Sequence, residues 1–343
     1  MGILDWFKNR PAQFDADRVS EELIRSAVDK AITLTNPRLA VLPGCHRRLA
    51  PAAEKAIEFL RALVSEMPAS RPLSAANWSA DPALRAFFVA PADIAAVLAR
   101  SDNLRTLFDK YIDLDEACVV LGMSFTEQRV FGMALQGDLV QRDVAQTSVS
   151  FSDHRAHICG RDESRLRRAV GAQAFEYLLA QALAEIGEER VERQELEANR
   201  SLLRARLRLL RQQGPGLGSL YGNSPPAASS EQARLEAELL DNEKQLAAIG
   251  GNESLLEMEL DSLREVLENP QRYLRTETRH LRLNPMNIVV EGESSEAVVD
   301  LDVHVAELSG AAPVRRAVIV ARVGREQMTQ APTMNLADAA RYL

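Results

Sequence analysis

Aromatic residues and cysteines are both scarce in this chain of 343 residues. The only cysteines are Cys45, Cys118 and Cys159, and such an odd, low number gives no disulfide framework. Aromatic residues make up 5% of the sequence, whereas Ala, Leu, Arg and Glu are abundant, a mixture that favours helices. We therefore expect a fold that depends on helices and a packed core rather than on disulfide bonds.

An excess of positive charge and long hydrophobic runs are also missing. The formal net charge is −8 and the isoelectric point is near 5.4, which argues against a nucleic-acid-binding protein. No apolar stretch reaches the length of a membrane-spanning helix, and the N-terminus has no long apolar core of a signal peptide. The cytoplasm is the compartment expected from this sequence.

The hydrophobic pattern of the first third is helical throughout. Apolar residues recur at helical spacing over 17–34 and 51–66, and shorter helices are expected to start near Asp81, Pro91 and Ser101. The sequence therefore predicts a helical N-terminal domain over residues 1–115.

Strand-like patterns occur in two regions that lie far apart along the chain. Residues 129–135 and 139–151 predict a hairpin that turns at Gly137-Asp138, and residues 299–305 alternate strictly between apolar and polar. A partner strand is expected over 314–323, with shorter strands at 281–283 and 288–290. The simplest assembly is one antiparallel sheet in a discontinuous β domain, 116–160 plus 271–325, and two separate small sheets are the alternative.

The stretch 161–270 between these regions is predicted to form a long antiparallel coiled-coil hairpin. Its second half spaces apolar residues alternately four and three apart over more than four heptads, with Asn242 at one of the seam positions. Gly250-Gly251 predicts a break after which the helix restarts at Asn252. The residues expected to carry interaction are Leu235, Leu239, Leu246, Leu256, Leu260 and Leu263.

Charge favours pairing of the two arms within one chain. Residues 200–211 of the first arm are basic and residues 231–243 of the second are acidic, so a fold at the tip brings opposite signs together. The Gly- and Pro-rich tip, 214–230, is expected to be flexible, and 326–343 to form a C-terminal tail. Homo-oligomerisation through the arms is the competing arrangement.

Two groups of side chains carry ligand chemistry, and neither has the spacing of a known motif. His154, His157 and Cys159 are weak candidates for a zinc site, because imidazole and thiolate are the ligands that zinc prefers. Asp300, Asp302 and His304 lie on one face of a predicted strand, and carboxylates with an imidazole are able to bind a hard cation or to act as acid and base. The alternation of these residues with apolar ones is also typical of a solvated sheet face, which is the favoured interpretation. No cofactor and no catalytic residue is predicted.

The first ten residues offer weak contact with a membrane. Ile3, Trp6 and Phe7 would insert into the lipid surface while Lys8 and Arg10 meet the headgroups. The alternative is a first helical turn that packs on the protein body.

Together these patterns predict an α+β fold with a helical N-terminal domain and a small antiparallel β domain that is interrupted by the helical hairpin. The leading interpretation is a non-enzymatic scaffold or assembly protein that presents the hairpin to a protein partner. The second interpretation is a peripheral membrane-associated protein that uses segment 1–10. The third is a metal-binding protein or enzyme with a site near His154, His157 and Cys159.

Overall fold

The computed structural model describes residues 19–136, 139–213, 226–249, 252–290, 297–310 and 313–329. It contains both helices and an antiparallel sheet, so the α+β class predicted from the sequence is confirmed. The chain divides into two compact units, one made of Arg18–Ile57 with Tyr177–Asn269 and one made mainly of Glu58–Glu176 with Pro270–Leu343. This division falls at other points than the predicted domain boundaries, which stay predictions.

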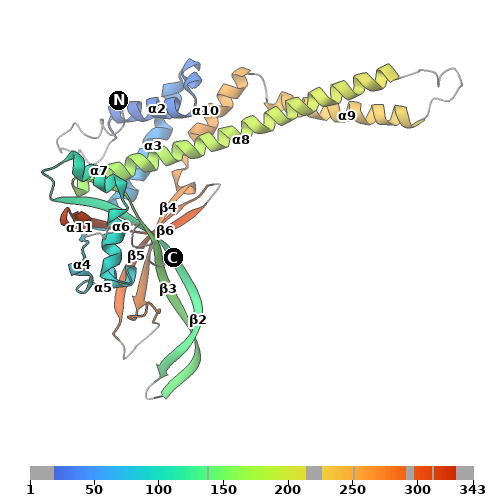
Figure 1. Ribbon diagram of the computed structural model, residues 1–343. Coiled ribbons are helices and arrows are strands. Elements are labelled where there is room, and N and C mark those ends of the chain that lie inside the picture. Colours follow the sequence, from blue (N-terminus) through green and yellow to red (C-terminus); the bar gives the residue numbers. More distant parts are fainter. Residues whose placement is uncertain are drawn as a thin grey trace, which may run out of the picture. The chain divides into compact units, whose positions relative to one another are not determined.

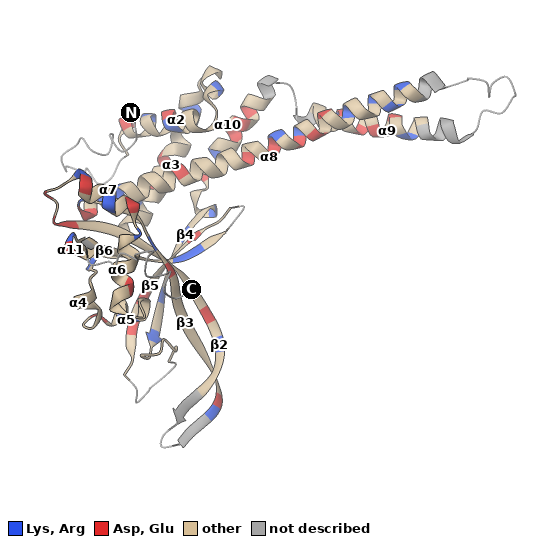
Figure 2. Cartoon of the chain, in the orientation of Figure 1, with Lys and Arg blue, Asp and Glu red and all other residues tan. Residues whose placement is uncertain are grey.

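The first unit is helical, and we call it the helical unit. Its longest elements, α8 and α9, run in opposite directions and lie side by side (Figure 1), and charged side chains are spread along both and along α10 (Figure 2). Its elements are α2 (Glu21–Thr35), the 3₁₀ helix η1 (Pro37–Val41), the first part of α3 (Cys45–Ser65), most of α8 (Glu163–Gln213), α9 (Pro226–Ile249) and α10 (Asn252–Glu268).

The helix boundaries in this unit follow the local sequence. Ser20 is the N-cap residue of α2, and its side chain accepts a hydrogen bond from the amide of Leu23. Helix α9 ends at Ile249 and α10 begins at Asn252, as the two glycines between them predict. The tip is shorter than predicted, because α9 already begins at Pro226 within 214–230. The remainder of that tip, 214–225, lies outside the described residues.

The second unit, which we call the sheet unit, holds a six-stranded sheet. Five strands follow the order β3-β2-β6-β5-β4, all antiparallel, and β1 pairs in parallel with β6. Both strand-like regions therefore join a single sheet, as predicted. The strands are β1 (Arg71–Pro72), β2 (Glu116–Gln136), β3 (Leu139–Gly160), β4 (Leu274–Leu283), β5 (Val299–Leu308) and β6 (Val314–Gly324).

Strands β2 and β3 form a hairpin much longer than the sequence predicts. Only Glu116–Ser124 of β2 pairs with β6, so the rest of β2 and the facing part of β3 continue as a twisted two-stranded ribbon (Figure 1). Polar residues such as Thr126, Glu127 and Gln128 occupy the middle of β2 and hide the alternation that would have identified the strand.

Short helices cover one face of the sheet and close its main hydrophobic core. Leu84, Phe87 and Leu98 from these helices are buried against strand residues that include Val119 and Val305. The helices are α4 (Ala75–Trp78), α5 (Pro82–Phe87), α6 (Pro91–Ala99) and α7 (Asp102–Lys110), with α11 (Glu326–Thr329) and the 3₁₀ helix η3 (Pro270–Arg272) near the strand ends.

The opposite face of the sheet meets the start of α8. Leu166 is fully buried there with Cys118 and Val320. The chain passes from β3 into α8 at Gly160, where an added Cβ would lie 2.6 Å from the backbone nitrogen of Leu166, so only glycine fits. Asp162 then accepts a hydrogen bond from the amide of Arg165 and caps the helix.

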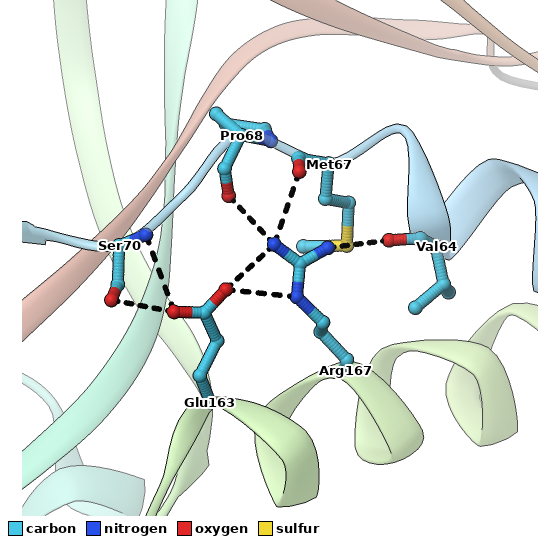
Figure 3. A network of polar contacts seen from close by, with 6 residues as sticks. All are labelled: Val64, Met67, Pro68, Ser70, Glu163 and Arg167. Carbon is cyan, nitrogen blue, oxygen red and sulfur yellow. Dashed lines mark hydrogen bonds and ion pairs between the residues drawn. The ribbon is translucent and has the colours of Figure 1, made fainter.

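An arginine on the first turns of α8 binds the C-terminal end of α3 (Figure 3). The Arg167 guanidinium donates hydrogen bonds to the carbonyl oxygens of Val64, Met67 and Pro68 at distances of 2.7, 3.1 and 3.0 Å. Glu163 accepts from Arg167 and from Ser70, which hold the pKa of its carboxyl below the usual value, with the Ser70 hydroxyl contributing most. The guanidinium thereby binds the turn that follows α3, where the Val64 carbonyl also accepts from the amide of Met67.

We expect Arg167→Ala to lower the free energy of unfolding by about 1–3 kcal/mol, because the carbonyls of Met67 and Pro68 lose this donor and that of Val64 keeps only the Met67 amide. Arg167→Lys should recover part of this loss, since an ammonium cannot reach all three carbonyls in a fixed fork. Urea unfolding followed by circular dichroism measures the change. Arg165→Ala, on the same helix turn, is the control. Among the described residues the Arg165 side chain forms a partly exposed ion pair with Asp162, so this change should have little effect. Equal stability of Arg167→Ala and the unchanged protein would contradict the assignment.

Candidate interaction surface on the long helices

The inner faces of α8 and α9 are joined by leucines. Leu203 and Leu207 of α8 are buried against Leu235 of α9, and Leu239 packs against the same cluster. Each fully buried leucine contributes about 1.5–3 kcal/mol relative to an exposed one, so this cluster holds the two helices together. The contact confirms that the two helices lie side by side, whereas the supercoiled geometry of a coiled-coil hairpin stays a prediction.

Polar groups fix how the two helices are aligned. Asn242 is only 3% exposed, and its side-chain amide donates to the carbonyl oxygen of Leu196 at 3.1 Å. Its Oδ1 atom has no hydrogen-bond partner among the described residues. Next to it Arg204 pairs with Glu243 at 2.6 Å. The buried amide loses solvation, and its NH₂ group reaches the Leu196 carbonyl in one alignment of the two helices, which makes Asn242 a register-setting residue.

A buried carboxylate holds α10 in the same unit. Glu259 is 4% exposed and accepts hydrogen bonds from Arg190 at 2.7 Å and from the Asn36 amide at 2.5 Å. Nearby, Ser262 donates to Glu189. Burial raises the pKa of the Glu189 carboxyl. The contacts of Glu259 join α10 to α8 and to the residue that begins η1, so this end of the unit has a defined arrangement.

The leucines predicted to carry interaction are used inside the chain. Leu235, Leu246, Leu260 and Leu263 are buried within the helical unit, and Leu239 and Leu256 are half-buried. Buried side chains present little surface to another protein. Their predicted role in binding stays a prediction, and their position indicates that a partner would meet other residues.

An exposed apolar row follows the outer face of α8, and we call it the outer row. It consists of Val191, Leu202 and Leu209, which are 54%, 66% and 57% exposed, with exposed Ala198 and Ala205 between them. At about 100° per residue this row lies roughly 150° around the helix from the leucines that face α9. Helix α8 therefore carries apolar residues on two nearly opposite faces, of which only one is covered.

The residues proposed for a metal site have other partners in the sheet unit. The His154 ring lies 2.8 Å from the carbonyl oxygen of Phe87 and stacks on Phe88 with 4.5 Å between the ring centroids. Burial lowers the pKa of His154. His157 is exposed on the same strand. Within the part of the chain that the structure describes, no group of three or more potential metal ligands comes together.

The thiol of Cys159 is poorly suited to metal binding, which requires a thiolate. Burial raises its pKa to about 12, partly offset by a hydrogen bond with Ser101. Burial also raises the pKa values of Cys45 and Cys118. The free thiols are therefore protonated at neutral pH.

The polar face of β5 is paired with β4 across the sheet. Asp300 binds Arg282 at 3.2 Å, and Asp302 binds His280 at 2.5 Å. His304 lies 3.1 Å from the hydroxyl of Thr278. Each of these pairs joins residues that face each other in the β4–β5 register. Because both members of the two ion pairs are largely exposed, the arrangement is that of a solvated sheet face.

The membrane contact predicted for Ile3, Trp6 and Phe7 lies outside the described residues. Among the helices that the structure describes, none combines the length and the apolar character that crossing a membrane requires.

Comparison of the chain with models of protein families, with curated proteins and with solved structures gives no match. The function of the chain is therefore inferred from its residues and their geometry alone.

The outer row of α8 was missed in the sequence, although a signal was present. Positions 191, 195, 198, 202, 205 and 209 follow the same alternation of four and three that marks a helix-packing seam. Glu195 and two alanines interrupt its hydrophobicity. The neighbouring seam of Leu196, Leu203 and Leu207 is more hydrophobic, so the sequence predicts packing on the inner face of the helix and gives no prediction for the outer face.

We expect the native protein to react with a disulfide reagent such as dithionitrobenzoate much more slowly than the unfolded chain. At pH 8 a thiol with a pKa near 12 holds only about one part in ten thousand as thiolate, the form that reacts. Stopped-flow absorbance with and without guanidinium measures both rates. Mass spectrometry of the modified peptides assigns Cys159, and equal rates for Cys159 in the native and unfolded states would contradict its burial.

Replacing Asn242 with leucine should raise the free energy of unfolding by about 1–2 kcal/mol, because a buried amide that is only half satisfied is removed. The same change should weaken the selection of one alignment between α8 and α9. Thermal unfolding and amide hydrogen exchange on these helices measure the two effects. Asn199→Leu, at an exposed position of α8, controls for added hydrophobicity. A clear loss of stability in Asn242→Leu would show that the amide is a net stabilising group.

Proposed function

We propose that this chain is a non-enzymatic scaffold or assembly protein that offers its long helices to a protein partner. The observation that supports this most is the outer row of α8, in which Val191, Leu202 and Leu209 are each more than half exposed. The cytoplasmic location expected from the sequence is kept as part of the proposal.

The outer row is suited to binding because it is both apolar and regularly spaced. Single exposed leucines are common on protein surfaces and need no explanation. Here the exposed residues follow one face of a helix at heptad spacing, which is how a helix presents itself to another helix. A contiguous apolar face rimmed by polar residues is typical of interaction sites.

The helix beneath the outer row is held firmly enough to act as a rigid support. Its inner face is anchored by Leu203 and Leu207. Nearer the start of α8, the ion pair of Arg190 with buried Glu259 anchors it to α10. An ordered helix needs to lose little conformational freedom on binding, which favours affinity.

The alternative of a metal-binding protein or enzyme has less support. His154 is engaged by the carbonyl of Phe87, His157 is exposed, and the Cys159 thiol has its pKa raised to about 12. No observation in the described residues favours the membrane interpretation, which depends on segment 1–10.

We expect the double change Leu202→Glu plus Leu209→Glu to reduce partner recovery about tenfold or more, because it places charge in the centre of the apolar face. The measurement is quantitative mass spectrometry after purification of the tagged full-length chain from its native cells. Leu240→Glu is the matched control, since Leu240 of α9 is similarly exposed, at 55%, on another helix. Circular dichroism should show unchanged folding for both. Equal recovery with the double variant and the unchanged protein would refute the proposal.

A further inference from the structure

We infer that the outer row of α8 pairs with the same row of a second copy of this chain, with the two helices antiparallel. This inference rests on the proposed function and names its partner. It differs from the pairing of α8 with α9 inside the chain, which remains intact, because the two pairings use nearly opposite faces of α8.

Register supplies the first argument. The outer row occupies two alternating seam positions, with Val191, Ala198 and Ala205 at one and Glu195, Leu202 and Leu209 at the other. In an antiparallel pair of helices, residues of one kind of position face residues of the other kind. A single twofold axis at residue 200 then satisfies the whole row. It places Leu202 against Ala198 of the second copy, Leu209 against Val191 and Ala205 against Glu195.

The size of the side chains agrees with this register. Each leucine meets a smaller side chain, so large and small residues alternate along the contact and the helices can approach closely. The one charged residue of the row, Glu195, meets Ala205, which leaves room for its aliphatic stem to lie along the contact while its carboxylate reaches solvent.

Charge selects the antiparallel direction. One flank of the outer row is acidic at one end, with Glu192, and basic at the other, with Arg206. The register centred on residue 200 brings Glu192 beside Arg206 of the second copy, and the symmetry repeats the pair. A parallel pair would instead face Glu192 and Arg206 with the uncharged residues Gly187 and Ser201 of the second copy, so neither ion pair would form. The described charges of α8 thus favour a second copy of this helix in the reversed direction.

The contact is short, so the association should be reversible and depend on concentration. At 1.5 Å per residue the segment from Val191 to Leu209 extends about 27 Å, which is about five helical turns. We therefore expect monomer at low protein concentration and dimer at high concentration. Sedimentation velocity on the full-length chain measures this equilibrium.

Spin-label distances distinguish the two directions. Ser201 and Gln194 are both exposed beside the outer row, and each is changed to cysteine in turn and labelled with a nitroxide. Antiparallel pairing about residue 200 separates the two labels along the axis by about 3 Å at position 201 and about 18 Å at position 194. Parallel pairing gives nearly equal distances at both positions. Labelling of the unchanged protein controls for its native thiols.

The variants used for the proposed function provide the decisive comparison. Leu202→Glu plus Leu209→Glu should raise the dissociation constant of the dimer at least tenfold, and Leu240→Glu should leave it unchanged. An unchanged dimer in the double variant, equal spin-label distances at the two positions, or a monomer at every concentration would overturn the inference. In the last case, a different partner that is lost from cells only in the double variant would leave the proposed function standing.

Discussion

Burial of Leu203 and Leu207 of α8 against Leu235 of α9 is the contact that holds these two helices together. A helix has room for one such apolar seam on the side that its neighbour covers. Any further apolar residue on the far side must face solvent or another molecule. The exposure of Leu202 and Leu209 is therefore a direct consequence of how α8 is already used. The surface proposed for binding is therefore the face of α8 that the internal packing leaves exposed.

Buried polar groups decide the alignment that the leucines alone would leave loose. Apolar contacts are nondirectional, and a shift of one heptad would bury a similar area. Asn242 reaches the carbonyl of Leu196 in only one alignment, and Glu259 requires both Arg190 and Asn36 to be in place. The carboxylate would be costly to bury alone and is stable here because two donors surround it. These hydrogen bonds select one alignment of α8, α9 and α10 over the alternatives.

The sequence was informative where a residue pattern alone determines structure. Strict alternation identified β5, and two glycines marked the boundary between α9 and α10. Most of β4 was missed, because an edge strand can be held by ion pairs such as Arg279 with Glu127 in place of apolar alternation. The candidate site was missed for a related reason. Heptad spacing locates a seam, but which seam is covered depends on the partner helix, and only the packed structure shows that Leu203 is buried and Leu202 is not.

The twisted ribbon of β2 and β3 bears on how copies of this chain can avoid unwanted contact. A two-stranded ribbon that extends beyond its sheet has backbone edges that can pair with another chain, and flat edges of this kind associate edge to edge into aggregates. Part of the β3 edge is already paired, since the Val149 amide donates to Asn287 and the Val289 amide to Thr147. Here the pairing shifts at three places along β2, including the step between Gly132 and Ala134, and Asp143 adopts a left-handed backbone conformation at φ 59°. Such irregularities bend the edges and interrupt the ladder of donors and acceptors. The ribbon is thus a poor template for the addition of a strand from another copy.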